Sequence, residues 1–477
     1  MTCPRSVACC AFALLSLCGA LTAAGAATRA QQPDWTAIEA ETLEHFQALL
    51  RLDTSNPPGN ETQATNYLRQ VLEREGIPVQ TFALEPDRAN LVARLKGNGK
   101  KRPVLIMGHT DVVTVDANKW VFPPFGAVRD NGYIYGRGAI DDKDNVVAAL
   151  MVMLTLKRQK VPLERDVIFL AESGEEGTTR VGIQFMTNQH FPEIDAEYCF
   201  AEGGGVRRTG GKVQHALIQT LEKVGRGIEL TARGPSGHGS VPLKGNAVVH
   251  LSAAVAAVGS WQPPARLNET TGTYFKRLAA ISTPEQASRY RALEEGGVNR
   301  TAAVDYLYEN EPSHASMLHA SISPNIIQGG YRSNVIPSEA KATLDVRVLP
   351  DEEPVAFLES VRRVVNDPAV EVRYVQQDVR PASSNTRLDS DAFKAVEKAV
   401  STHYQTVTLP TMSTGATDMA YLRAKGIQCY GIGPATDFED GPKGFGAHSD
   451  QERILESELH RFVRFNWDIV VDTARSR

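Results

Sequence analysis

The chain has 477 residues, of which 42% are hydrophobic and 22% are charged, proportions typical of a folded globular protein and not of a disordered one. Its formal net charge of -5, without a long basic run, argues against a nucleic-acid-binding surface. The length exceeds what one hydrophobic core usually serves, so we expect two or three domains.

Residues 1–30 have the pattern of a secretory signal peptide. Arg5 precedes an apolar run at 7–21, and the small residues after it offer an A-x-A type cleavage site. We therefore expect a secreted or periplasmic protein that has no membrane association once the signal is removed, because no later stretch is long and apolar enough to cross a bilayer. Lipid anchoring through Cys18 is disfavoured, since Leu17 stands where a lipoprotein signal has Gly or Ala.

Cysteine usage excludes a disulfide framework. Four of the six cysteines fall inside the predicted signal peptide, and only Cys199 and Cys429 remain in the mature chain. Both lie in apolar runs of strand character. This leaves two interpretations: buried free thiols, or one bridge between neighbouring strands in an oxidising compartment.

The mature chain begins with helices and strands in alternation. Apolar residues at helical spacing indicate helices, and short apolar runs bounded by turn residues indicate strands. Such alternation predicts an α/β fold of three layers, with a mixed, largely parallel sheet whose ligands bind outside the carboxyl ends of its strands. The predicted helices are 35–51, 62–75, 145–159 and 182–188, and the predicted strands are 79–84, 90–95, 104–107, 166–171 and 197–201.

A second domain interrupts the first. The pattern changes to alternating strands, GIELTARG and AKATLDVRVLP, separated by helical stretches at 247–258 and 355–365. Residues 267–313 form a helical elaboration to which we assign no role, and a capped helix near Leu388 returns the chain to the first domain. The expected boundaries are 31–225 and 386–477 for the two segments of the first domain and 226–385 for the insert.

Side chains able to bind a metal ion follow several of the predicted strands. Because parallel strands bring their carboxyl ends to one edge of a sheet, such side chains can converge although they are far apart in sequence. Imidazoles together with three or more carboxylates suit zinc, or manganese or cobalt. The candidates are His109 and Asp111 after the strand at 104–107, Glu172, Glu175 and Glu176 after that at 166–171, Glu202 after that at 197–201, Asp141 and Asp142 ahead of the helix at 145–159, and His448 in a polar loop near the C-terminus.

Each candidate also has an ordinary interpretation. His448 by itself is a solvated turn histidine, and Glu175 with Glu176 is a surface pair. Asp141 with Asp142 is an acidic cluster stabilised by the dipole at a helix N-terminus. The joint pattern favours the metal site, because random surface charges rarely all fall at strand ends or at junctions between loops and helices.

Six motifs give the chain a resemblance to a known family. GHTDVV, W-x-x-P-P-F from Trp120 to Phe125, YGRGAIDDK, ESGEEG, AEGG and GAHSD look like the motif series of the co-catalytic di-zinc metallopeptidases. That family includes aminoacylase, acetylornithine deacetylase, succinyl-diaminopimelate desuccinylase, glutamate carboxypeptidase and carboxypeptidase S, and the resemblance covers nearly all of the mature chain. The spacing around Trp120 is most similar to the branch of carboxypeptidase S and the N-acyl amino acid hydrolases.

The resemblance implies a centre with two Zn²⁺ ions per chain, for which Co²⁺ or Mn²⁺ can substitute. Asp111 would lie behind His109 and orient its ring. Glu175 would be the general base, which takes a proton from the attacking water and passes it to the leaving amine. The implied metal ligands are His109 and Glu202 on one ion, Glu176 and His448 on the other, and Asp141 bridging both.

The same resemblance identifies the insert as an α+β, ferredoxin-like lid that also carries a homodimer contact. His238 in GPSGHGS would help to bind the carbonyl oxygen as negative charge develops, often in the neighbouring subunit's site. Asn334 and Arg347 would hold a substrate carboxylate, for which the forked guanidinium is suited. Gly415 lies in a loop that would shape the wall of the site. Without the resemblance, His238 is a turn histidine and Arg347 an ordinary arginine on a strand face.

Together these inferences predict a function. We expect an exported zinc-dependent peptidase that hydrolyses an amide bond next to a free carboxylate, as a carboxypeptidase or dipeptidase acting on small peptides. An N-acyl amino acid amidohydrolase is the alternative within the same mechanism. The competing class is a non-catalytic binding protein on a two-domain α/β frame, which would hold no metal and would not depend on Glu175.

Overall fold

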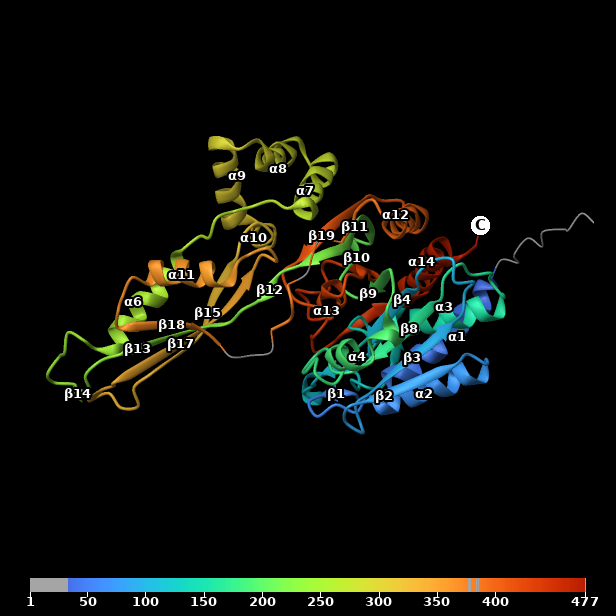
Figure 1. The fold of residues 1–477 in the computed structure, drawn as a ribbon, viewed down its shortest axis with the longest axis horizontal. Helices are drawn as coiled ribbons and strands as arrows, with labels where there is room; N and C mark the ends of the chain where they lie inside the picture. Colours follow the sequence, from blue (N-terminus) through green and yellow to red (C-terminus); the bar gives the residue numbers. More distant parts are fainter. Residues whose placement is uncertain (1–32, 376–378, 383, 385, 477) are drawn as a thin grey trace, which may run out of the picture.

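The computed structural model describes residues 33–375, 379–382, 384 and 386–476. The predicted signal peptide, with its four cysteines, lies outside these residues. The molecule is elongated: a large α/β part contains the first and last helices, and a smaller α+β part projects from it (Figure 1). The predicted α/β class with an inserted α+β unit is confirmed.

A mixed sheet of ten strands, counted over the described residues, forms the centre of the large part. Its middle is parallel, since β4 pairs in parallel with β8 and β9, and β9 with β20. The spatial order is β2 (Val79–Ala83), β3 (Ala89–Leu95), β8 (Val167–Glu172), β4 (Val104–His109), β9 (Tyr198–Ala201), β20 (Gln428–Gly431), β11 (Lys212–Glu222), β10 (Gly205–Thr209) and β21 (Ala435–Asp437), with β19 (Thr408–Ser413) paired to β11.

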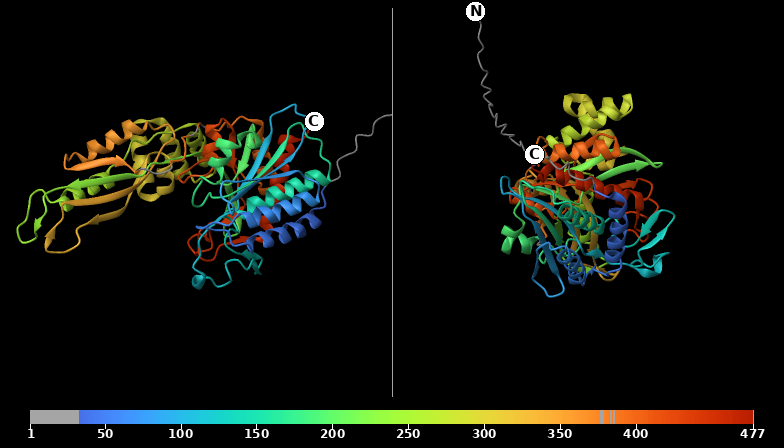
Figure 2. Two further views of the ribbon diagram at one scale, coloured as in Figure 1. Left: turned by 60° about the horizontal axis from the view of Figure 1, so that its bottom comes forward. Right: turned by 90° about the vertical axis from the view of Figure 1, so that its right-hand side faces the viewer.

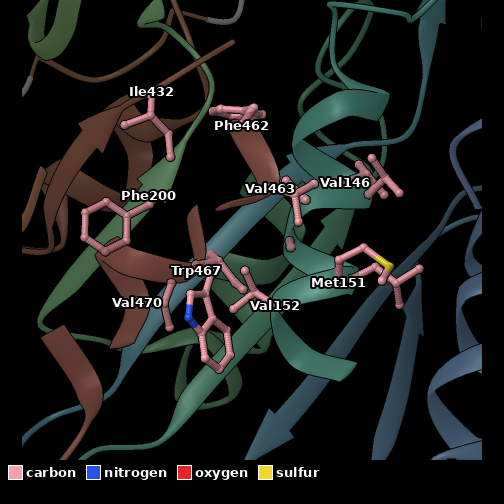
Figure 3. Close-up of a cluster of buried hydrophobic side chains, with 14 of the residues drawn as sticks. Val146, Met151, Val152, Phe200, Ile432, Phe462, Val463, Trp467 and Val470 are labelled. Atoms are coloured by element: carbon pink, nitrogen blue, oxygen red, sulfur yellow. The ribbon is translucent and has the colours of Figure 1, made fainter. Parts of the chain in front are cut away.

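Helices cover both faces of this sheet, which gives the three predicted layers. Successive residues of β4 face opposite sides: Val104 and Ile106 join one buried cluster, and Leu105 and Met107 join the other. Figure 3 shows part of the first cluster, built largely from the helices α3 and α14. The helices of that face are α1 (Trp35–Leu50), α2 (Thr62–Arg74), α3 (Lys143–Arg158), α12 (Asp391–Tyr404) and α14 (Glu456–Ala474), and those of the other face are α4 (Ile183–Gln189), α5 (Phe191–Ile194) and α13 (Met419–Ala424).

The hairpin of β10 and β11 was not predicted from the sequence. Its first half is polar and contains a glycine pair at the turn, and the outer part of β11 is not buried, so no apolar run marks it. Cys199 on β9 and Cys429 on β20 lie opposite each other and are buried free thiols. Of the two interpretations, the structure therefore has the buried free thiols.

The inserted part is an antiparallel sheet with two helices on one face (Figures 1 and 2). The alternating burial along β17 shows that one side of the sheet packs against these helices and the other side is open. Its strands are β12 (Val224–Gly225), β13 (Ile228–Arg233), β15 (Ser321–Gly329), β17 (Glu339–Val348) and β18 (Val370–Tyr374), its helices are α6 (Ala247–Ser260) and α11 (Pro354–Val365), and a separate ladder at its tip joins β14 (Gly237–His238) to β16 (Val335–Ile336).

The predicted helical elaboration is present, but it packs on the ten-stranded sheet of the large part. Its buried residues form one cluster with Leu221 of β11 and with Leu409 and Met412 of β19. It therefore braces the edge of the large sheet next to the junction with the insert. The helices are α7 (Glu269–Ile281), α8 (Pro284–Glu295), α9 (Gly297–Asn310) and α10 (Pro312–Ser316).

Across the described chain, no helix combines the length and the apolar character needed to span a membrane.

Short elements complete the large part. The remaining elements are the parallel pair β1 (Ser55–Asn56) and β5 (Val112–Val113), the three strands β6 (Val128–Asp130), β7 (Tyr133–Tyr135) and β22 (Arg453–Leu455), and the 3₁₀ helix η1 (Ala117–Lys119).

Candidate metal centre

The predicted ligands meet at the carboxyl edge of the parallel strands. His109 is the last residue of β4, and Glu202 follows β9, the next strand in the sheet. Asp141 comes from the loop before α3, where one of its oxygens lies 3.0 Å from His109 Nε2 and the other lies 3.1 Å from His448 Nε2. A carboxylate held between two imidazoles in this way can bridge two cations.

The other two ligand candidates lie on either side of Asp141. Glu176 Oε1 is 2.9 Å from His448 Nε2, and Glu202 Oε2 is 3.8 Å from His109 Nε2. Ligand atoms of His109, Asp141 and Glu176 all lie within 4.8 Å of one another, a spacing close enough to hold one ion. Contacts through His109, Asp141 and His448 thus link all five residues into one cluster.

The charge of this cluster fits a divalent cation. Burial and the neighbouring carboxylate of Glu175 raise the pKa of Glu202 well above its usual value. Burial also disfavours ionised Asp141, but hydrogen bonds with His109 and His448 hold its pKa below the usual range. Buried carboxylates at this density need positive charge beside them, and bound cations of the zinc or manganese type would supply it.

Asp111 fixes both His109 and the loop that carries the two glutamates. The nearest acceptor for His109 Nδ1 is the backbone carbonyl of Asp111 at 3.0 Å, and the Asp111 carboxylate lies slightly farther away at 3.6 Å. With Nδ1 donating to that carbonyl, Nε2 presents its lone pair to the centre. The carboxylate accepts hydrogen bonds from the backbone N–H groups of Gly174, Glu175 and Glu176, at 2.9, 3.2 and 3.1 Å.

Further residues that position the centre were missed from the sequence. Asn56 donates to the Asp111 carboxylate at 2.8 Å, and its only sequence signal was a turn before Pro57. Glu452 is buried and accepts from Arg137 at 2.7 Å and from the N–H of Ile140 at 2.9 Å, which holds the loop that ends in Asp141. These contacts join residues more than fifty positions apart, so local patterns do not reveal them.

Two of the candidate carboxylates lie behind the ligands. Asp142 accepts a hydrogen bond from the backbone N–H of His109 at 3.1 Å and is buried. Glu172 is the buried last residue of β8, and its Oε2 has no hydrogen-bond partner in the described chain. Neither belongs to a group of potential ligand atoms among the described residues.

His448 is held by a strained backbone. Its φ of 60° lies in the left-handed region, which is uncommon for residues other than glycine. In this conformation the imidazole reaches Asp141 and Glu176, and these two carboxylates raise its pKa to about 10. The strain at this residue coincides with its role in closing the cluster.

Glu175 lies beside the ligands and does not face bulk solvent. One of its oxygens belongs to a second close group with His109 and Glu202. Arg380 Nη2 donates to Glu175 Oε1 at 2.5 Å and to Asp418 at 3.2 Å. Burial and the Asp418 carboxylate raise the pKa of Glu175 to about 8. Arg380 stands in the connection from the insert back to the large part, where no sequence motif identified it.

The residues predicted in the insert divide into two sets. Arg347 on β17 lines a cavity together with Ala416, which directly follows Gly415. His238 and Asn334 are exposed at the tip of the insert, where the Asn334 carbonyl accepts from Gly239 at 2.8 Å. Figure 1 places β14 at the end of the insert farthest from the catalytic sheet, so one chain does not bring His238 to its own metal centre.

Sequence comparison gives a family for the chain. Residues 105–470 match Peptidase family M20/M25/M40. A probable carboxypeptidase S-like 2 of Dictyostelium discoideum is 29% identical over 343 residues, which are 69% of this chain and 64% of that protein. The human N-fatty-acyl-amino acid synthase/hydrolase PM20D1 is 27% identical over 381 residues, 77% of this chain and 74% of that protein. The chain thus spans less than two thirds of the carboxypeptidase S-like relative.

Solved structures share the fold. The M20 family metallo-carboxypeptidase Sso-CP2 of Sulfolobus solfataricus superposes with a TM-score of 0.67 at 20% identity, over 90% of this chain and 98% of that one. The YXEP protein of Bacillus subtilis, a dinuclear metal binding peptidase from the M20 family, gives a TM-score of 0.58 at 15% identity, over 91% and 99%. Because the family match spans more than half of the sequence, the chain belongs to Peptidase family M20/M25/M40 and is a metal-dependent hydrolase.

Proposed function

We propose that the protein is an exported, zinc-dependent carboxypeptidase or dipeptidase that hydrolyses an amide bond next to a free carboxylate. The observation that carries this proposal is the position of Asp141, whose two oxygens lie 3.0 and 3.1 Å from two different imidazoles. A carboxylate with one imidazole beside each of its oxygens can bridge two neighbouring cations.

Each step of the proposed reaction has a candidate residue in the described chain. Two bound cations would polarise the scissile carbonyl and lower the pKa of water from about 15.7 towards 7. Glu175 accepts the proton that the attacking water loses and returns it to the leaving nitrogen, so that the amide C–N bond breaks without a covalent acyl-enzyme. Asp111 holds Glu175 in place through the backbone N–H of that residue. The ions would be held by His109, Glu202, Asp141, Glu176 and His448.

Deacylation of N-acyl amino acids is the second candidate. It uses the same centre, because an acyl amino acid also places an amide next to a free carboxylate. The similarity to an N-fatty-acyl-amino acid synthase/hydrolase favours it, whereas the carboxypeptidase S-like relative favours the peptidase. The two activities differ only in what occupies the acyl side of the bond.

A homodimer through the insert would complete the site. His238 and Asn334 are exposed at the tip, and large apolar side chains nearby are also exposed, among them Tyr331 (82%), Val241 (62%) and Ile327 (59%). A second copy that covers this surface would bury apolar area and bring His238 to the partner's metal centre. There the imidazole would stabilise charge on the carbonyl oxygen.

Metal replacement with a substrate panel tests the proposal. The purified mature chain is stripped with a chelator and assayed with zinc, cobalt or manganese added back, on dipeptides and on N-acyl amino acids. We expect about two bound zinc ions per chain by elemental analysis. Activity should return with metal and be greatest on dipeptides. Faster release from acyl amino acids selects the second candidate, and a folded chain that binds no metal rejects both. Mass spectrometry of the exported chain tests removal of residues 1–30.

A further inference from the structure

A cavity of about 410 Å³ lies where the sheet of the insert meets the large part. Its wall includes Arg226, Asp345 and Arg347 from the insert, together with Arg380 and Ala416. It adjoins the metal centre, because Arg380, which lines it, also contacts Glu175 at 2.5 Å. A substrate bound at the metals could therefore extend into this cavity.

The wall of the cavity carries more positive than negative charge. Arg347 is already paired: its Nε and Nη2 donate to the two oxygens of Asp345 at 2.7 and 3.2 Å. Arg380 uses Nη2 for Glu175 and Asp418, while its buried Nε has no hydrogen-bond partner. Arg226 forms no ion pair with any residue that the structure describes, and its Nε is also buried without a partner. On each of these two guanidinium groups, Nε thus has no hydrogen-bond partner within the described chain.

A buried lysine lies near Arg347 of this wall. Lys223 is 1% exposed and donates to Ser321 Oγ at 2.9 Å and to the carbonyls of Ser316 and His319 at 3.0 and 3.1 Å. None of these partners is charged. Burial and the nearby guanidinium of Arg347 both lower the pKa of Lys223. Among the described residues that line the cavity, Asp345 is the one carboxylate. Arg347 already neutralises its charge.

We propose that this cavity binds a second carboxylate of the substrate, so that the enzyme releases an acidic amino acid, aspartate or glutamate. The proposal rests on the proposed function, in which Arg347 is the predicted partner of the free carboxylate next to the scissile bond. Arg226 is the anchor of the second carboxylate, because its side chain has no ion pair within the described residues and a planar guanidinium binds carboxylate through two hydrogen bonds. An apolar side chain in the same place would leave Nε of Arg226 unpaired, and an amide would offer one neutral acceptor oxygen in place of the two charged oxygens of a carboxylate.

Matched substrate pairs test the charge preference. Gly-Glu and Gly-Gln, and likewise N-acetylglutamate and N-acetylglutamine, have almost the same shape and differ by one negative charge. We expect kcat/KM to be at least about tenfold higher for the acidic member of each pair, as a charge-assisted hydrogen bond in a partly buried site would give. Equal values in the unmodified enzyme would overturn the subsite and leave the proposed function intact.

Variants locate the preference. Arg226→Met should lower the ratio to near one, mainly through loss on the acidic substrate, and Arg226→Lys should restore part of it. Arg233→Met is the matched control, because Arg233 is an exposed arginine on β13 of the same sheet, paired with Glu371 at 2.8 Å. A ratio unchanged in Arg226→Met would reject the assignment. Retained hydrolysis of the neutral substrate shows that each variant is folded.

Equilibrium binding separates this inference from the proposed function. Glutarate, with two carboxylates, and glutaramate, with one, are titrated by calorimetry into the metal-loaded enzyme, without any turnover. We expect glutarate to bind at least about tenfold more tightly, with the difference lost in Arg226→Met. If no peptide or acyl amino acid is hydrolysed but this difference holds, the reaction assignment fails and the anion subsite stands. Equal binding of the two compounds overturns the subsite.

Discussion

The metal centre and the tip of the insert hold their predicted residues in opposite ways. His109 is the buried last residue of β4, Asp141 lies 3.0 Å from its Nε2, and the backbone N–H of Glu176 donates to Asp111. The side chain of His238 is exposed and, among the described residues, hydrogen-bonds only to Ser240, whose Oγ lies 2.7 Å from Nδ1. The first region is organised within one chain, whereas the second needs another surface before it can act.

The largest effect should come from the organised region. Glu175→Gln keeps the size of the side chain but removes its ability to take a proton, so we expect kcat to fall by about a thousandfold, within the range for a lost general base. Bound zinc and the melting temperature should change little, because Glu175 is not among the predicted ligands. Glu44→Gln, on the exposed side of α1, is the control and should keep full activity. Activity retained in Glu175→Gln would favour the binding-protein class.

A second large effect should come from the tip. His238→Ala should lower kcat by about a hundredfold if the imidazole stabilises charge in the partner's site. Sedimentation should show a dimer for both this variant and Glu175→Gln. Melting temperatures should match that of the unmodified protein, because the side chain is exposed.

Mixing the two inactive variants tests whether His238 acts in the partner's site. In a hybrid dimer, one site receives an intact Glu175 from its own chain and an intact His238 from the partner. Random exchange of subunits should therefore restore about a quarter of the sites, a result that a site formed within one chain cannot give. No recovery after verified exchange would place His238 outside the partner's site.

This contrast also explains what the sequence could reveal. His109 and Glu202 follow apolar runs that are buried on both faces, so the edge of the sheet and its chemistry were predictable from local pattern. Arg380 and Asn56 act through contacts with residues far away in the chain, and neither stands in a recognisable motif. The hairpin of β10 and β11 was missed because its outer half is polar.

A smaller effect is expected at the residue that organises the loop. Asp111→Ala leaves the N–H groups of Gly174, Glu175 and Glu176 without their acceptor. Buried unsatisfied donors and a loosened ring of His109 should lower activity by about ten- to a hundredfold and reduce zinc affinity. The melting temperature should also fall, which distinguishes this variant from Glu175→Gln. Asp111→Asn should recover only part of the loss, since its amide nitrogen cannot accept.

The smallest effect concerns Lys223, which lies between β11 of the large part and β12 of the insert. Burial lowers its pKa to about 7 from an ordinary value of 10.5, so between these pH values the unfolded chain binds more protons than the folded one. The contribution of Lys223 to the free energy of unfolding therefore increases as pH rises through this window, by at most about 1.4 kcal/mol per pH unit. Compared with Lys223→Met, the unmodified protein should gain melting temperature between pH 6.5 and 9.5.

Lys341→Met provides the control for this measurement. Lys341 lies on β17 of the same insert, is 40% exposed and pairs with Glu339 at 3.3 Å, so its replacement should give a difference in melting temperature that does not vary with pH. A pH-independent difference for Lys223→Met as well would mean that the junction keeps this lysine charged. In that case the hydrogen bonds to the carbonyls of Ser316 and His319 stabilise the ammonium enough to offset the cost of its burial.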